Sequence, residues 1–147
     1  RDSAENDEPL RLYYRKFPEN ERGFVYLAHE IRDSDDIYFP VLGPESSSLG
    51  NAPSDDSNPS NGIALDEIFS YEIIQDDARI DVIIRRGDGT GPIIGHNYVD
   101  MREQNSGYDV PHEWMYFKAG AYSQNSTGEG ADYDQVTFYE LENSHDM

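Results

Sequence analysis

The chain has 147 residues, which is room for one domain of ordinary size. It contains no cysteine, and this excludes disulfides, thiolate metal sites and cysteine nucleophiles. Lys and Arg number 11 against 30 Asp and Glu, so the formal net charge is −19. Such a negative field opposes binding to nucleic acid or to an anionic membrane surface.

Alternation with a period of two recurs along the chain, whereas helix signals are nearly absent. Turn residues at 18–23, 75–78 and 87–92 separate the alternating runs. About eight strands without helical crossovers predict an all-β fold, an antiparallel β-sandwich or jelly roll. The predicted strands, in chain order, are 10–16, 24–31, 37–42, 67–74, 79–86, 93–101, 113–124 and 135–142.

One connection is unusually long and polar. Residues 43–62 read GPESSSLGNAPSDDSNPSNG, with almost no apolar side chains. Connections of this length inside compact domains are usually lids, binding loops or disordered insertions. The sequence therefore predicts a long mobile loop over 43–62, either a lid beside a groove or plain disorder.

The acidic loops do not form a recognisable metal motif. The clusters at 33–36, 55–56 and 128–134 do not match the ligand spacing of an EF-hand. The four histidines (His29, His96, His112 and His145) show no zinc spacing. We expect no metal and no cofactor, with a calcium site in one of the acidic loops as the open alternative.

The most informative segment is the predicted strand 113–124. In a regular strand its even positions share one face. That face carries aromatic rings, a cation and an amide, which can stack on and hydrogen-bond a sugar chain; the alternative is a solvent face with ordinary cross-strand tyrosine pairs. These side chains are Trp114, Tyr116, Lys118, Tyr122 and Gln124.

Residues 116–124, YFKAGAYSQ, resemble the Tyr-Phe-Lys-Ala-Gly-x-Tyr-x-Gln signature of the β-jelly-roll alginate lyases at every fixed position. The resemblance implies a polysaccharide lyase that cleaves the 1,4-glycosidic bonds of alginate by β-elimination and releases unsaturated oligouronates. It also implies that Tyr122 is the catalytic acid and often the base. Two alternatives stay open: a lyase for another polyuronate such as a glucuronan, and a non-catalytic carbohydrate-binding jelly roll.

A second family motif is Gln-Ile-His or Gln-Val-His, roughly ninety residues upstream of the catalytic tyrosine. His29 lies 93 residues before Tyr122, within an alternating run, and the resemblance makes it the second base. Leu27 stands where the family has glutamine. Leucine cannot donate a hydrogen bond to a substrate carboxylate, so either the register of the motif differs here or that contact comes from another residue.

The remaining predicted site residues bind substrate. Lys118 lies about 13 Å along the strand from Tyr122, which assigns it to substrate carboxylates in an adjacent subsite. Tyr116, Gln124 and Trp114 share its strand face. Local cations must decide the binding of a polyanion to so acidic a chain, because salt screens the long-range field beyond about 8–10 Å. Besides Lys118, the candidate groove cations are Arg85, Arg86 and Arg102, with Arg86 assigned to substrate binding, and Arg11 and Arg15 are further possibilities.

A third family motif, Arg-Ser/Thr-Glu-Leu/Val-Arg, has no match among the 28 residues before His29. We therefore expect residues 1–147 to be one partial catalytic domain that lacks N-terminal strands. A companion N-terminal segment or chain would supply those strands and an arginine. The resemblance and the acid excess indicate a secreted bacterial protein adapted to salty surroundings, with an acidic polysaccharide as its partner and neither nucleic acid nor membrane.

Overall fold

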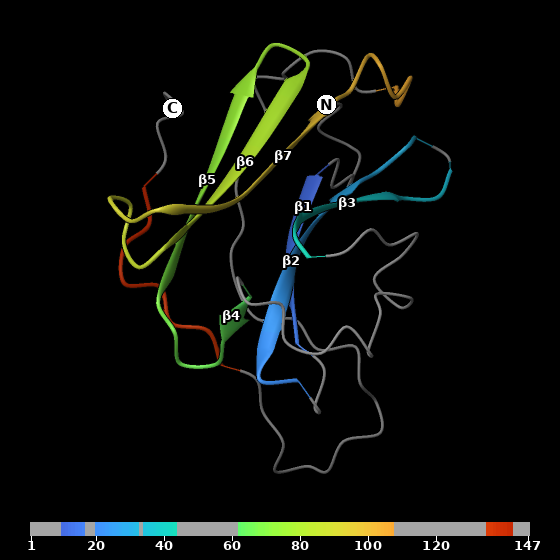
Figure 1. Ribbon diagram of the computed structural model, residues 1–147. Helices are drawn as coiled ribbons and strands as arrows, with labels where there is room; N and C mark the ends of the chain where they lie inside the picture. The colour runs from blue at the N-terminus through green and yellow to red at the C-terminus, as the bar shows by residue number, and fades with distance from the viewer. Residues whose placement is uncertain (1–9, 17–19, 33, 44–61, 108–134, 143–147) are drawn as a thin grey trace. The chain divides into compact units, whose positions relative to one another are not determined.

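The computed structural model describes residues 10–16, 20–32, 34–43, 62–107 and 135–142. The chain divides into two compact units, residues 1–115 and 116–147. All the regular secondary structure in the described residues is β-strand, and its strands pair in antiparallel fashion (Figure 1). No helix in this part of the chain is long and apolar enough to cross a membrane. The prediction of a single domain over 1–147 stays a prediction.

The first sheet of unit 1 is built around a buried central strand. β2 (Arg22–His29) pairs on one side with β1 (Leu10–Arg15) and on the other with β3 (Ile37–Leu42). A two-residue strand, β4 (Ile63–Ala64), pairs with the first residues of β2. Every residue of β2 from Gly23 to His29 is buried, so both faces of this strand are covered.

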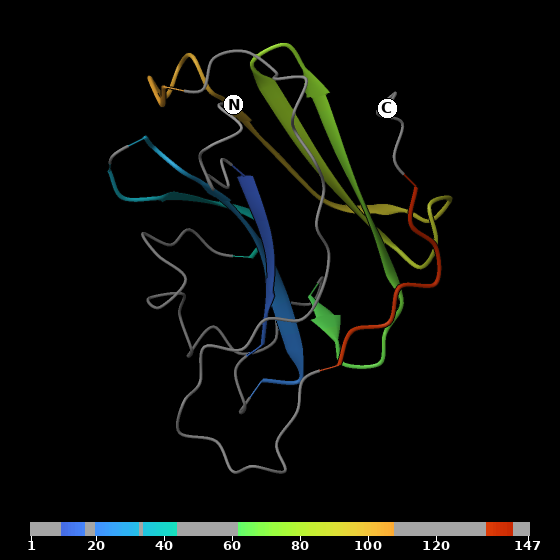
Figure 2. The same cartoon turned by 180° about the vertical axis from the view of Figure 1, so that it is seen from behind.

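The second sheet of unit 1 is a meander of three strands (Figure 2). It consists of β5 (Phe69–Asp76), β6 (Arg79–Arg86) and β7 (Ile93–Asp100). A tight turn joins β5 to β6, with Asp77 in the left-handed region at φ 53°. The glycine-rich turn before β7 includes Gly87 at φ 75°, a conformation that favours glycine. Both turns fall where the sequence predicts them.

One hydrophobic core lies between the two sheets. Because side chains alternate along a strand, each sheet contributes one face to this core. β7 comes so close to β3 that a Cβ on Gly95 would lie 2.4 Å from the carbonyl oxygen of Val41. The Asn97 amide also donates to the carbonyl of Pro40 across the same approach, at 2.7 Å. The buried core residues are Val25, Leu27, Val41, Leu42, Ile63, Ala78, Ile80, Val82, Ile84, Val99 and Met101.

The prediction of an antiparallel β-sandwich is confirmed, and six predicted strands match β1, β2, β3, β5, β6 and β7 within two residues at each end. The predicted strand 113–124 lies outside the described residues, as does nearly all of the predicted loop 43–62. The predicted strand 135–142 is wrong: these residues form no strand, and their apolar side chains, such as Val136 and Phe138, are exposed. A strand needs a partner for its backbone groups, and these residues pair with no strand in the described part of the chain.

Candidate active site

The residues of the lyase signature lie outside the described residues, so their predicted roles stay predictions. They are Trp114, Tyr116, Lys118, Tyr122 and Gln124. The described part of unit 1 contains two other predicted site residues, His29 and Arg86, together with Arg11 and Arg15. Their surroundings show what unit 1 contributes by itself.

His29 lies at the end of β2 on the face that packs into the core. Its strand neighbours on that face are Val25 and Leu27, both of which belong to the hydrophobic core. Leu27 and His29 are each 0% exposed. Leu27, the residue in the glutamine position of the family motif, is therefore a core side chain. The imidazole of His29 therefore points to the core side of the sheet and not to its outer face. Its role as second base stays a prediction.

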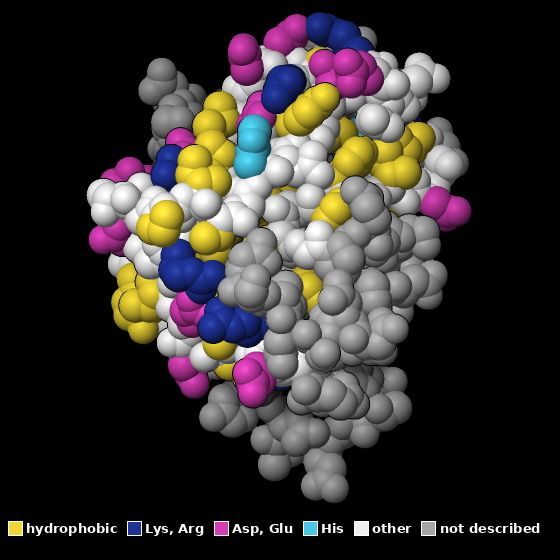
Figure 3. All heavy atoms as spheres, viewed as in Figure 1, with side chains coloured by type: hydrophobic (Ala, Val, Ile, Leu, Met, Phe, Trp, Pro, Cys, Tyr) yellow, Lys and Arg dark blue, Asp and Glu magenta, His cyan; other side chains and the backbone are white. Residues whose placement is uncertain are grey.

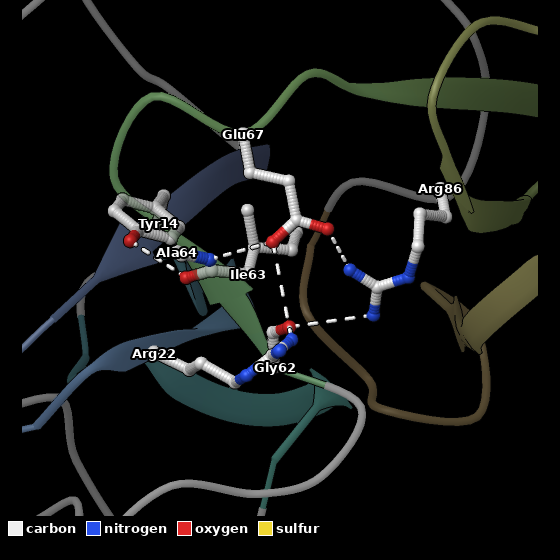
Figure 4. Close-up of polar contacts among 7 residues, drawn as sticks. All are labelled: Tyr14, Arg22, Gly62, Ile63, Ala64, Glu67 and Arg86. Carbon is white, nitrogen blue, oxygen red and sulfur yellow. Dashed lines mark hydrogen bonds and ion pairs between the residues drawn. The ribbon is translucent and has the colours of Figure 1, made fainter.

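Arg86 is held in a cluster of charged groups beside β4, drawn in Figure 4. Its guanidinium forms an ion pair with Glu67 and donates to the carbonyl of Gly62 at 3.3 Å. Arg22 donates to the same carbonyl at 3.0 Å and lies 3.9 Å from Glu67. Glu67 also accepts from the amide of Ala64 at 2.9 Å. We call Arg22, Glu67 and Arg86 the Arg–Glu–Arg cluster.

This cluster connects both sheets to the chain that enters β4. Arg22 belongs to β2 and Arg86 to β6, and both donate to Gly62. The hydroxyl of Tyr14 on β1 donates to the next carbonyl, that of Ile63, at 2.9 Å. Substrate binding by Arg86 stays a prediction, and a substrate carboxylate would have to compete with Glu67 for its guanidinium.

A further group of candidate side chains covers the face of the first sheet that points away from the core. Across this face Arg11, Ala28 and Tyr38 form one row of neighbours, and Tyr13, Tyr26 and Pro40 form the next. Arg15 lies opposite Phe24 and extends the face. We call Arg11, Tyr13, Arg15 and Tyr38, which are all partly exposed, the arginine–tyrosine face; Tyr26 between them is 0% exposed. Its tyrosines were not predicted as site residues, although the Arg-x-Tyr-x-Arg alternation in β1 is visible in the sequence.

The charges on this face are arranged around Arg11. Its guanidinium forms an ion pair with Asp36, which lies just before β3, and sits 5.9 Å from the centre of the Tyr13 ring. Burial, and then the negative charge of Asp36, raise the pKa of the Tyr38 hydroxyl above its ordinary value. Tyr38 therefore keeps its proton at neutral pH and serves as a hydrogen-bond donor rather than as a base.

The outer face of the second sheet carries a separate charged cluster. Asp81 on β6 accepts two bonds from Arg79, at 2.7 and 3.0 Å, and contacts His96 on β7 at 2.8 Å. The Arg79 guanidinium also lies 3.8 Å from the centre of the Tyr98 ring. Figure 3 shows a histidine at the surface with basic, acidic and hydrophobic side chains beside it. Because Asp81 holds Arg79 and His96, which lie on neighbouring strands, the cluster joins β6 and β7 at the sheet surface.

The Asp81 cluster predicts a loss of stability in acid. The hydrogen bonds from Arg79, and then from His96, hold the pKa of Asp81 at about 2, below its ordinary value of 3.8. A carboxyl whose pKa is lower in the folded state stabilises the fold above the unfolded pKa, and this contribution is lost as pH falls through about 2. Asp81→Asn should therefore lower the free energy of unfolding at pH 6 by about 1 kcal/mol or less, and by much less at pH 2, where the folded carboxyl is half protonated.

Urea denaturation of both proteins between pH 2 and pH 6 measures this difference. Glu72→Gln removes one negative charge from the exposed face of the neighbouring strand β5 and is the control. An equal effect of Asp81→Asn at both pH values would contradict the prediction.

Among the residues that the structure describes, no group of three or more His, Asp or Glu side chains could hold a metal ion. The acidic clusters at 55–56 and 128–134 lie outside these residues, so the alternative of a loop calcium site stays untested. What the described part of unit 1 offers is chemical complementarity to an acid sugar: guanidinium groups for carboxylates, and phenol rings and hydroxyls for the sugar ring.

The described residues thus define an antiparallel two-sheet β protein with arginine and tyrosine side chains on the outer face of one sheet. The comparisons with known proteins give the family. The profile of the alginate lyase family matches residues 1–145. The chain is also 42% identical over 144 residues to a curated alginate lyase from Klebsiella pneumoniae. This chain belongs to the alginate lyase family.

The structural comparison agrees with this assignment. The crystal structure of the alginate lyase from Klebsiella pneumoniae matches 71% of this chain with a TM-score of 0.56 and 39% sequence identity. The chain accounts for 35% of that structure and for 45% of the curated relative, so it spans less than half the length of either. The predicted resemblance to the alginate lyases is thereby confirmed.

Proposed function

We propose that this chain carries part of the catalytic domain of an alginate lyase, which cleaves 1,4-glycosidic bonds of the polymer by β-elimination. The observation that carries the proposal is the complete signature at residues 116–124, within a chain that the family profile matches from residue 1 to residue 145. The arginine–tyrosine face supports the same polymer, since guanidinium groups bind carboxylates with matched geometry.

The proposed chemistry has three requirements. The carboxylate at C6 is neutralised so that the proton on C5 becomes acidic, a base removes that proton, and an acid protonates the departing O4. A double bond forms between C4 and C5, and the new chain end is an unsaturated uronate. We assign Tyr122 as the acid and, as tyrosinate, the base. Lys118, Tyr116, Gln124 and Trp114 bind neighbouring sugars.

The proposal also gives roles to His29 and Arg86, two residues of unit 1. His29 is proposed as a second base, although it is buried on the core side of β2. Arg86 is proposed as a substrate-binding cation, although Glu67 and Gly62 already engage its guanidinium. We further propose that a companion N-terminal segment supplies the arginine that neutralises the C6 carboxylate, that the protein is secreted, and that the reaction needs no metal.

The experiment is incubation of the purified protein with alginate while the ultraviolet absorbance of the unsaturated product is followed. Polymannuronate, polyguluronate and glucuronan are assayed in parallel, with and without a chelator. An increase in absorbance on alginate supports the proposal, and an increase only on glucuronan assigns the other polymer. Binding without any absorbance change would leave a carbohydrate-binding protein and refute the lyase. The intact mass of the active species shows whether a companion segment is present.

A further inference from the structure

The ion pair between Arg11 and Asp36 spans the first sheet above a small side chain. Arg11 on β1 and Tyr38 on β3 are both direct neighbours of Ala28 on β2, and Asp36 lies two residues before Tyr38. Opposite neighbours in an antiparallel sheet point to the same face, so the pair crosses the central strand over Ala28. Its two side chains remain partly accessible, at 33% for Arg11 and 19% for Asp36.

Aromatic groups surround this pair. The Arg11 guanidinium lies 5.9 Å from the centre of the Tyr13 ring, and Tyr38 hydrogen-bonds Asp36. Arg15, two strand positions beyond Tyr13 on β1, adds a second guanidinium to the same face. The ion pair thus lies beside aromatic rings and a phenol hydroxyl.

The ion pair with Asp36 shows that the Arg11 guanidinium binds a carboxylate at this position. A guanidinium binds the carboxylate of a uronate by the same charge-assisted hydrogen bonds. We propose that Arg11 is a carboxylate-binding residue for an acidic polysaccharide, and that Asp36 is the internal carboxylate that an incoming uronate displaces. Tyr13 and Tyr38 then contact the sugar that carries this carboxylate. The identity of the polymer rests on the proposed function.

If an incoming uronate displaces Asp36, substitutions of Arg11 and of Asp36 should have different effects on binding. Arg11→Gln removes the cation and should weaken binding of an alginate hexasaccharide about 10- to 100-fold. Asp36→Asn removes the competing carboxylate and leaves Arg11 in place, so the same oligosaccharide should bind at least as tightly as to the original protein. A pair that only stabilises the fold predicts instead that both changes reduce binding and stability together.

Isothermal titration calorimetry on the full chain measures these affinities, with thermal unfolding followed by circular dichroism. The probe is the alginate hexasaccharide, compared with the same oligosaccharide after conversion of its carboxylates to methyl esters. Arg11→Gln should abolish most of the preference for the free acid. Arg79→Gln is the matched control, because it breaks another Arg–Asp pair on a sheet surface, with Asp81 at 2.7 Å on the second sheet.

The outcomes separate this inference from the proposed function. Weaker binding in Arg11→Gln, with Asp36→Asn and Arg79→Gln unimpaired, supports the inference whether or not the protein cleaves alginate. Equal losses in Arg11→Gln and Asp36→Asn, unchanged binding in Arg11→Gln, or no binding to the original protein would each overturn it. Asp36→Asn also decides the matter by itself if Arg11→Gln does not fold, since reduced affinity in that variant contradicts displacement. Cleavage by the original protein tests the lyase proposal alone.

Discussion

Tyr122→Phe is expected to lower the turnover of alginate at least about 100-fold, while the protein folds normally and still binds the polymer. The substitution removes one oxygen and retains the ring, so packing changes little. Transfer of a proton to O4 is lost, and a positioned acid or base is typically worth roughly 10²- to 10⁴-fold in rate. Steady-state kinetics with product absorbance give kcat and KM, and circular dichroism establishes that the variant is folded.

Two neighbours on the same predicted strand face serve as controls for this experiment. Tyr116→Phe makes the same chemical change six residues earlier on that face, and Lys118→Ala removes the predicted subsite cation. Both should mainly raise KM, because both residues are assigned to binding rather than to proton transfer. Near-normal kcat in Tyr122→Phe would show that another group carries the chemistry.

Leu27→Gln is expected to destabilise the fold by about 3 kcal/mol or more. It restores the residue type of the family motif, yet Leu27 belongs to the core and is 0% exposed. The change removes buried apolar surface and places an amide where water cannot reach it, and both effects cost free energy. Urea denaturation measures the loss. Leu27→Met keeps the volume and the apolar character, so it should cost less than about 1.5 kcal/mol.

This substitution also tests the face to which His29 belongs. Leu27 and His29 are two residues apart on β2 and share one side of it. If Leu27→Gln leaves stability unchanged and raises kcat/KM, position 27 faces the substrate, and the imidazole of His29 does so too. If stability falls and activity does not rise, the glutamine of the family motif has no counterpart on β2.

The sequence allowed the strands to be predicted, but it did not show which face of β2 packs into the core. In β6 the alternation is clear, because Ile80, Val82 and Ile84 are buried between partly or fully exposed residues. In β2 both alternating sets are buried: Phe24, Tyr26 and Ala28 on one face, Val25, Leu27 and His29 on the other. Alternation identifies such a strand without telling which set meets the core, so a histidine of either set can look like a site residue.

Other features depended on partners that are remote in the sequence. Arg86 looked like a free groove cation, but Glu67, 19 residues earlier, binds it. β4 has two residues, too few to show any alternation. The run 135–142 alternates and yet forms no strand, since alternation describes the side chains and pairing of the backbone requires another strand. The proposed role of Arg11 depends on its contact with Asp36, which lies 25 residues later in the sequence.

The Arg–Glu–Arg cluster has a consequence for protein engineering. Two arginines from different sheets hold Gly62, so the chain enters β4 and β5 from a fixed point regardless of how many residues precede it. An epitope, a protease site or a second binding module grafted before Gly62 would therefore still be followed by a carbonyl that two arginines hold.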